Sequence, residues 1–199
     1  MSELELVTAG GHGGCEAISE PLERCLAFFR AIGLPWAWKR GAKGFLDGVE
    51  VEQGALLVDP CASASNILHE AGHLAILPGR FRRNASGDLS AAMERMFGEV
   101  DFSDPDSGIA RAAIQCGDAE ATAWAWAVGV YLGLPPKTII KDAEYDGTGA
   151  FLRTSLRVGA YAGINGLSHA GFCAVRPGIY ATARGLPVYP QLAMWLQNA

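Results

Sequence analysis

The sequence predicts one α+β domain in which a small β-sheet lies at one end of a mainly helical body. Short runs with strand patterning are confined to residues 36–58, and most of the remaining chain has helical patterning punctuated by glycine and proline. A chain of 199 residues, half of them hydrophobic and 19% charged, can bury one sizeable core. We therefore expect a single domain over residues 1–199, without internal repeats.

The first predicted helix begins after Ser19, a suitable N-cap residue, and has Pro21 in its first turn. It ends at Gly33-Leu34-Pro35. Three strand-like segments follow: residues 36–39, residues 45–51 with an Asp47-Gly48 hairpin signal, and the apolar run at residues 55–58. These segments predict the small sheet.

The next predicted helix contains His69-Glu70-Ala71-Gly72-His73. Ser63 or Ser65 can cap its N-terminus, and Pro78-Gly79 can end it. Apart from the motif, residues 67–77 are apolar almost all the way around the helix, which is typical of a helix buried on every side.

The polar segment 80–106 predicts a short amphipathic helix at residues 89–97. Residues 109–132 then predict one long helix, which Gly133-Leu134-Pro135-Pro136 ends. Residues 138–199 predict two or three helices joined by glycine-rich turns, and the small residues at 159–163 would permit close helix contact.

The H-E-x-x-H motif predicts a metal centre. Burial of two imidazoles and a carboxylate is costly unless something pairs with them. His69 and His73 are one helical turn apart, so their side chains point the same way and can bind one divalent cation. Glu70 lies beside them and can act as a base. The spacing therefore favours a zinc hydrolase.

Glu120 is the expected third ligand. If residues 109–132 form one helix, positions 113, 116, 120, 124, 127 and 131 share an apolar stripe on which Glu120 is the lone carboxylate. A buried carboxylate takes up a proton or pairs with a cation. Asp118 falls on the more polar face with Gln115 and needs no such partner. His12, Cys15 and the acids of segment 80–106 are weaker candidates.

Bulk properties exclude other classes of function. The net charge of −5 disfavours nucleic-acid binding, which needs a basic face. The longest stretch without an acidic, basic or histidine side chain, residues 121–136, is too short for a membrane span. The acidic N-terminus has no apolar run behind it and predicts no signal peptide. With five scattered cysteines and no C-x-x-C pair, we expect a cytoplasmic protein.

Two segments resemble the ImmA/IrrE-type metallopeptidases. The first is residues 55–60 followed by Asn66-Ile67-Leu68-His69-Glu70-Ala71-Gly72-His73-Leu74. The second is residues 120–127, closing at Leu134-Pro135. The resemblance covers residues 35–140 and leaves residues 141–199 as a helical C-terminal part. It implies a compact zincin-like fold, zinc on the two histidines and Glu120, and cytoplasmic endopeptidase activity, often against a transcriptional regulator.

We therefore expect a zinc peptidase acting on a peptide or protein, with Glu70 as general base. Residues 55–58, as an edge strand, would bind the extended substrate. The developing oxyanion needs a donor, for which Tyr161 and His169 are the first candidates and Tyr145 and Arg153 the others. Two alternatives stay open: a zincin-scaffold binding or regulatory module with weak or no turnover, and a zinc amidase acting on a small amide.

Overall fold

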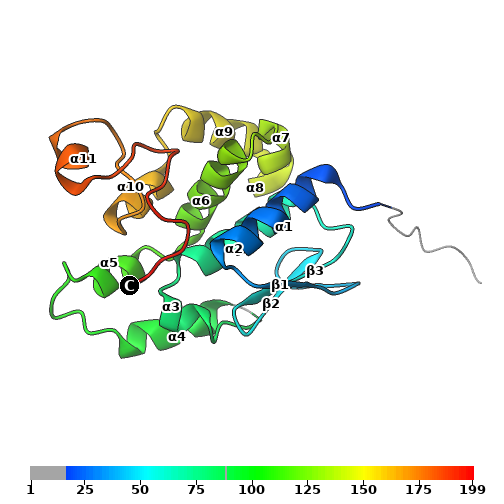
Figure 1. Cartoon of the computed structure of the whole chain (residues 1–199), viewed down its shortest axis with the longest axis horizontal. Coiled ribbons are helices and arrows are strands. Elements are labelled where there is room, and N and C mark those ends of the chain that lie inside the picture. Colours follow the sequence, from blue (N-terminus) through cyan, green and yellow to red (C-terminus); the bar gives the residue numbers. More distant parts are fainter. Residues whose placement is uncertain (1–16, 88) are drawn as a thin grey trace, which may run out of the picture.

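The computed structural model describes residues 17–87 and 89–199 and shows a mixed α/β architecture (Figure 1). Within these residues there are eleven helices and one three-stranded sheet. The sheet lies at one end of the molecule beside α1 and α2, and the other helices form the rest of the body. The expected combination of a small sheet and a helical body is therefore confirmed.

Helix α1 (Glu20–Ile32) forms as expected, with a proline in its first turn. Its C-cap Gly33 has a φ of 79°, a left-handed conformation that glycine adopts without steric cost. Strand β1 (Trp36–Trp38) follows directly. Leu22, Leu26 and Phe29 face the core from α1.

Strand β3 (Ala55–Val58) is the central strand of the sheet, parallel to β1 and antiparallel to β2 (Val49–Glu52). Both sides of β3 are paired: Leu56 is in register with Trp36 on one side and Val51 on the other. The expectation that residues 55–58 form an edge strand is therefore wrong, and they cannot receive a substrate by strand addition.

The hairpin between β2 and β3 turns at Gln53-Gly54, where φ is 48° and 74°. Two successive positive φ angles are typical of the tight turns that join antiparallel strands. Asp47-Gly48, expected to be the hairpin, instead belongs to an irregular loop in which Gly48 lies against Ala62. The dipeptide signal identified a turn but not the one between the strands.

Helix α2 (Ala64–Ile76) carries the H-E-x-x-H motif and is buried on nearly every side. The Ser63 hydroxyl accepts a hydrogen bond from the Asn66 amide at 3.3 Å and so caps the helix, as expected. Leu68, Ala71 and Ala75 are fully buried. The prediction that this helix lies inside the protein is confirmed.

Helices α3 (Gly79–Arg82) and α4 (Leu89–Glu99) occupy the polar segment. The expected long helix over residues 109–132 is instead two helices, α5 (Gly108–Ile114) and α6 (Asp118–Tyr131). The break spans residues 115–117, where Gln115 and Gly117 have non-helical backbone angles. A second helix therefore begins at Asp118, and residues before and after the break do not share one helical face.

Helix α6 packs against both α2 and α10 (Ala162–His169). A Cβ added at Gly72 of α2 would lie 2.5 Å from the Ala121 carbonyl oxygen, so the two backbones meet closely at this point. Gly163 of α10 is pressed in the same way against the Ala119 carbonyl. The expected close helix contact at residues 159–163 is thus observed.

The remaining elements are α7 (Pro136–Ile139), α8 (Glu144–Gly147), α9 (Gly149–Arg157) and α11 (Ile179–Arg184). After α11 the chain returns to the core, where the Gln197 amide donates to the Ala75 carbonyl at 2.8 Å. The Trp124 indole donates to the Trp195 carbonyl at 2.9 Å. The C-terminal part therefore shares its core with α2 and α6.

No helix of the described residues combines the length and the apolar character needed to cross a lipid bilayer.

Candidate metal centre

The two histidines of the motif face one another across one turn of α2. The Nε2 atoms of His69 and His73 are 3.1 Å apart, and the rings meet edge to face. His69 is only 9% exposed. Their relative placement follows from the four-residue spacing, as expected.

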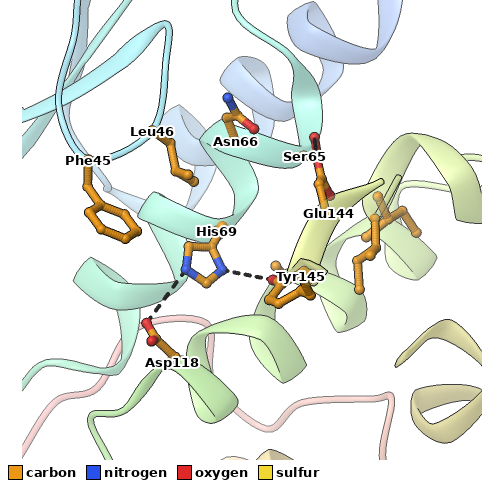
Figure 2. Close-up of a pocket in the computed structure, with 11 residues that line it drawn as sticks. Phe45, Leu46, Ser65, Asn66, His69, Asp118, Glu144 and Tyr145 are labelled. Carbon is orange, nitrogen blue, oxygen red and sulfur yellow. Dashed lines mark hydrogen bonds and ion pairs between the residues drawn. The ribbon is translucent and has the colours of Figure 1, made fainter. Parts of the chain in front are cut away.

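Asp118, the first residue of α6, brings a carboxylate to the two histidines. Its Oδ1 atom lies 3.0 Å from His73 Nε2 and 3.8 Å from His69 Nε2. Figure 2 shows the Asp118 and His69 side chains directed toward one another. One ligand atom from each of the three residues lies within 4.8 Å of the others, which defines the candidate metal centre.

Glu120 is not part of this group, so the structure differs here from the expected ligand set. The Glu120 carboxylate is directed toward α10, where it lies against the position of Gly166. The cause is which face of α6 meets α2: Ala121 packs against Gly72 of α2, whereas Glu120 lies on another face of the helix, which packs against α10. Asp118 lies in the first turn of α6, a position that favours acidic residues. The dipeptide Gly117-Asp118 is a sequence signal for a helix that begins there.

Tyr145 of α8 contacts the other nitrogen of His69. Its hydroxyl lies 3.2 Å from His69 Nδ1 and 2.9 Å from the Thr122 hydroxyl of α6. A hydrogen bond to Nδ1 holds the imidazole ring and leaves Nε2 directed at the metal centre. Nothing in the sequence pattern singles out Tyr145 for this contact, because it depends on how α8 packs on α2.

The three side chains fit a divalent transition metal. Burial, followed by the charge of His73, lowers the pKa of His69 to about 4, so this imidazole is neutral at physiological pH, as a metal ligand must be. The hydrogen bond with His73 lowers the pKa of Asp118, which is therefore ionised. Two imidazoles and one carboxylate are a donor set used by catalytic zinc sites.

Glu70 lies next to the metal centre and is 6% exposed. Burial raises the pKa of its carboxyl group, and the nearby Asp118 carboxylate raises it further, against the lowering effect of His73. A carboxylate with a raised pKa is a more effective proton acceptor and donor near neutral pH. The environment of Glu70 therefore suits acid–base chemistry.

The candidate oxyanion donors lie in different places. Tyr161 is the residue that precedes α10. Burial raises the pKa of its hydroxyl, the hydrogen bond with Thr122 lowers it, and the charges of Glu120 and Asp118 raise it. Tyr161 is therefore near the centre. His169, at the other end of α10, is exposed and belongs to neither the metal-ligand group nor the cavities described below.

Arg153 is buried, and its hydrogen-bond partners lie outside the metal-ligand group. It donates to the Ile140 carbonyl at 2.7 Å and pairs with Asp142. His12 and Cys15, the weaker ligand candidates, lie outside the described residues. Cys116 borders the centre, but burial raises its pKa to about 12, and its thiol donates to the Ala112 carbonyl. A protonated thiol is a poor metal ligand.

Two cavities flank the metal centre. The first, of about 300 Å³, borders His69, and the surface it exposes is mainly apolar. The second, of about 240 Å³, borders Glu70 and His73. Phe45 and Asp118 line both cavities, so the two cavities lie on either side of these side chains.

Searches against protein-family models, curated proteins and solved structures found no match to this chain.

Proposed function

We propose that this protein is a zinc-dependent peptidase. The observation that carries the proposal is the convergence of His69, His73 and Asp118 within 4.8 Å, with the Glu70 carboxylate on the adjacent cavity. A metal-ligand set beside a buried carboxylate of raised pKa is what metal-assisted hydrolysis of an amide requires.

His69, His73 and Asp118 would hold the ion. When bound, zinc supplies Lewis acidity that makes water a nucleophile at neutral pH and polarises a carbonyl. Glu70 accepts one proton as the water oxygen attacks the carbonyl carbon. It then delivers that proton to the amide nitrogen as the C–N bond breaks, which yields a carboxylic acid and an amine. Tyr145 holds the His69 ring in place during this exchange.

The two cavities favour a peptide over a small amide as substrate. A small amide needs one pocket beside the ligands, whereas a peptide extends in both directions from the bond that is cleaved. Cavities on the His69 side and on the His73 side match the second case. Since β3 is paired on both sides, substrate binding relies on these cavities rather than on strand addition.

Glu70 favours an enzyme over a binding module on the same scaffold. A purely structural metal site has no use for a buried carboxylate next to its ligands, since burial of such a group is costly. The resemblance to ImmA/IrrE-type metallopeptidases supports a zincin-like fold and a regulatory protein as substrate. The net charge of −5 favours a protein partner over a nucleic acid, and the cysteine pattern favours the cytoplasm.

The test combines metal analysis with peptide cleavage. We expect about one zinc per chain and cleavage of peptides from a diverse library, which a chelator abolishes. Glu70→Gln should retain the metal and lose cleavage, because it removes the proton acceptor and keeps the shape of the side chain. Two histidines and a carboxylate also bind Fe(II), so the metal analysis should measure both ions.

His73→Ala is the companion variant, and it should lose the metal. Wild-type protein purified without any bound metal, and unable to take up zinc, would remove the basis of the proposal. Undiminished cleavage by Glu70→Gln would instead retain the metal centre and reject Glu70 as the base.

A further inference from the structure

The cavity beside His69 has a chemical character that predicts what it binds. Its volume of about 300 Å³ is at the lower end of the roughly 300–1,000 Å³ of ligand pockets. It is therefore large enough to hold one large side chain. Leu46, Ala125, Ile139 and Ile140 supply its apolar lining. Figure 2 shows His69 and Asp118 at the same opening.

The apolar wall is fixed in place before any ligand arrives. Ile139 and Ile140 are each only 2% exposed. A Cβ added at Gly129 would collide with the Ile139 side chain, so α6 and α7 are in direct contact. The carbonyl of Ile140 accepts a hydrogen bond from the buried Arg153 guanidinium at 2.7 Å. A preformed wall binds without the entropy cost of ordering it.

The charge at the far side of the cavity is already engaged. Glu144 accepts from the Ser65 hydroxyl at 2.7 Å through Oε1 and from the Lys141 amide at 2.9 Å through Oε2. The Lys141 ammonium lies 3.6 Å from Oε1. A basic side chain entering the cavity would have to compete with these partners for Glu144, and the other acid that lines the cavity, Asp118, belongs to the candidate metal centre, so the cavity favours a neutral, apolar group.

Phe45 lines both cavities. It lies in the loop between β1 and β2 and is 88% exposed. Exposure of a single phenylalanine is ordinary, and Phe151 on α9 is 73% exposed. Phe45 differs because it borders both cavities at the candidate ligands. A bound apolar side chain would remove part of this ring from water.

We infer that the cavity beside His69 selects a large apolar side chain, such as leucine or phenylalanine, in the substrate residue next to the cleaved bond, and that Phe45 packs over it. This inference rests on the proposed peptidase function for the identity of the substrate. The selection itself is a property of the cavity and can be measured without turnover.

The experiment uses the full chain carrying Glu70→Gln, so that peptides bind without being cleaved. The probes are blocked pentapeptides, acetyl-Gly-Gly-X-Gly-Gly-amide, with leucine, phenylalanine, alanine or lysine at X. Binding is followed by NMR through the methyl groups of Ile139 and Ile140. Leucine and phenylalanine should bind about tenfold or more tightly than alanine, the discrimination expected of an apolar pocket. Lysine should bind no better than alanine.

Two further variants test whether Phe45 and Ala125 form part of the apolar pocket. Phe45→Ala should reduce the preference for leucine severalfold, whereas Phe151→Ala, which removes an exposed phenylalanine elsewhere, should not change it. Ala125→Leu places extra volume in the cavity and should abolish the preference. Its melting temperature distinguishes a filled cavity from an unfolded protein, and Phe45→Ala tests the inference independently because the site is exposed.

The outcomes separate this inference from the proposed function. Equal binding of leucine, alanine and lysine, no binding of any probe, or a preference for lysine would overturn the apolar pocket. A preference for leucine in a protein whose wild type cleaves no peptide would retain the pocket and reject the peptidase. Cleavage by the wild type without any side-chain preference would retain the peptidase and reject the apolar pocket.

Discussion

Tyr145 reaches His69 from a backbone conformation that residues with a side chain rarely adopt. Its φ is 55°, and that of Asp146, which follows, is 56°. Such non-glycine residues cost about 1–3 kcal/mol each and persist only where the surrounding structure holds them. Here the Tyr145 hydroxyl contacts both His69 and Thr122. The turn therefore serves to direct this hydroxyl at the metal centre.

Tyr145→Phe tests that role. The variant keeps the ring and removes only the hydroxyl, so the protein should fold while zinc affinity falls by about 10–100-fold, the typical effect of removing a partner that orients a metal ligand. Zinc titration against a competing chelator measures the change. Tyr180→Phe, at a half-exposed tyrosine of α11, is the control. Equal zinc affinity in the two variants would show that Tyr145 does not orient His69.

Asp118 and Glu120 lie two residues apart on α6, and their substitution is expected to have contrasting effects on zinc affinity. Asp118→Ala should lower zinc affinity by more than about 100-fold, because loss of a direct ligand exceeds the usual effect of an outer partner. Glu120→Ala should change zinc affinity little, since its carboxylate lies against Gly166. Calorimetric titration of both variants measures this ranking. The opposite ranking would restore Glu120 as the ligand.

At the scale of elements, the metal centre depends on how closely α6 approaches α2. The contact at Gly72 and Ala121 sets this distance, and Asp118 lies one turn before Ala121 on the same helix. A side chain at position 72 would push the two helices apart and withdraw the carboxylate from the histidines. The glycine inside the H-E-x-x-H motif is therefore required by packing.

Gly72→Ala should destabilise the protein by about 1–3 kcal/mol, the usual cost of overpacking a core, and should weaken zinc binding at the same time. Gly98→Ala is the matched control, because a Cβ at Gly98 of α4 meets nothing within 4 Å. It should be neutral or stabilise the helix by about 0.5–1 kcal/mol. Denaturant unfolding of both variants checks the prediction, which fails if they have the same stability.

At the scale of the molecule, the C-terminal segment joins elements that are distant in the sequence. Gln197 is 4% exposed, and its side-chain amide donates to the Ala170 carbonyl at 3.0 Å. Its backbone carbonyl accepts from Arg82 at 2.5 Å, and its backbone amide donates to Ala75. The last residues thus link α2, α3 and the end of α10.

Gln197→Ala should cost about 1–3 kcal/mol because it leaves the buried Ala170 carbonyl without its partner. In a chain of this size each kcal/mol lowers the melting temperature by roughly 2–4 °C. Gln191→Ala, at an exposed glutamine of the same segment, should leave it unchanged. Calorimetry should show one transition for the whole chain. A separate transition for residues 141–199 would mean that the C-terminal part folds independently.

The sequence alone determined the features that depend on near neighbours in the chain. The spacing of His69, Glu70 and His73 defines their relative positions on α2, and the apolar residues around them predict its burial. The helix caps at Ser63 and Gly33 were also readable, because each depends on a few adjacent residues. These are local properties with fixed periodicity.

Only the tertiary structure decided which other side chains meet the two histidines. Helix α6 meets α2 through the face that carries Asp118 and Ala121, and it meets α10 through the face that carries Glu120. Tyr145 comes from α8, and the apolar cavity is lined by residues of α6, α7 and the loop between β1 and β2, whose approach to α2 no periodicity encodes. Because α6 is buried on several faces, its own pattern does not show which face meets α2, so the third ligand depended on packing between helices.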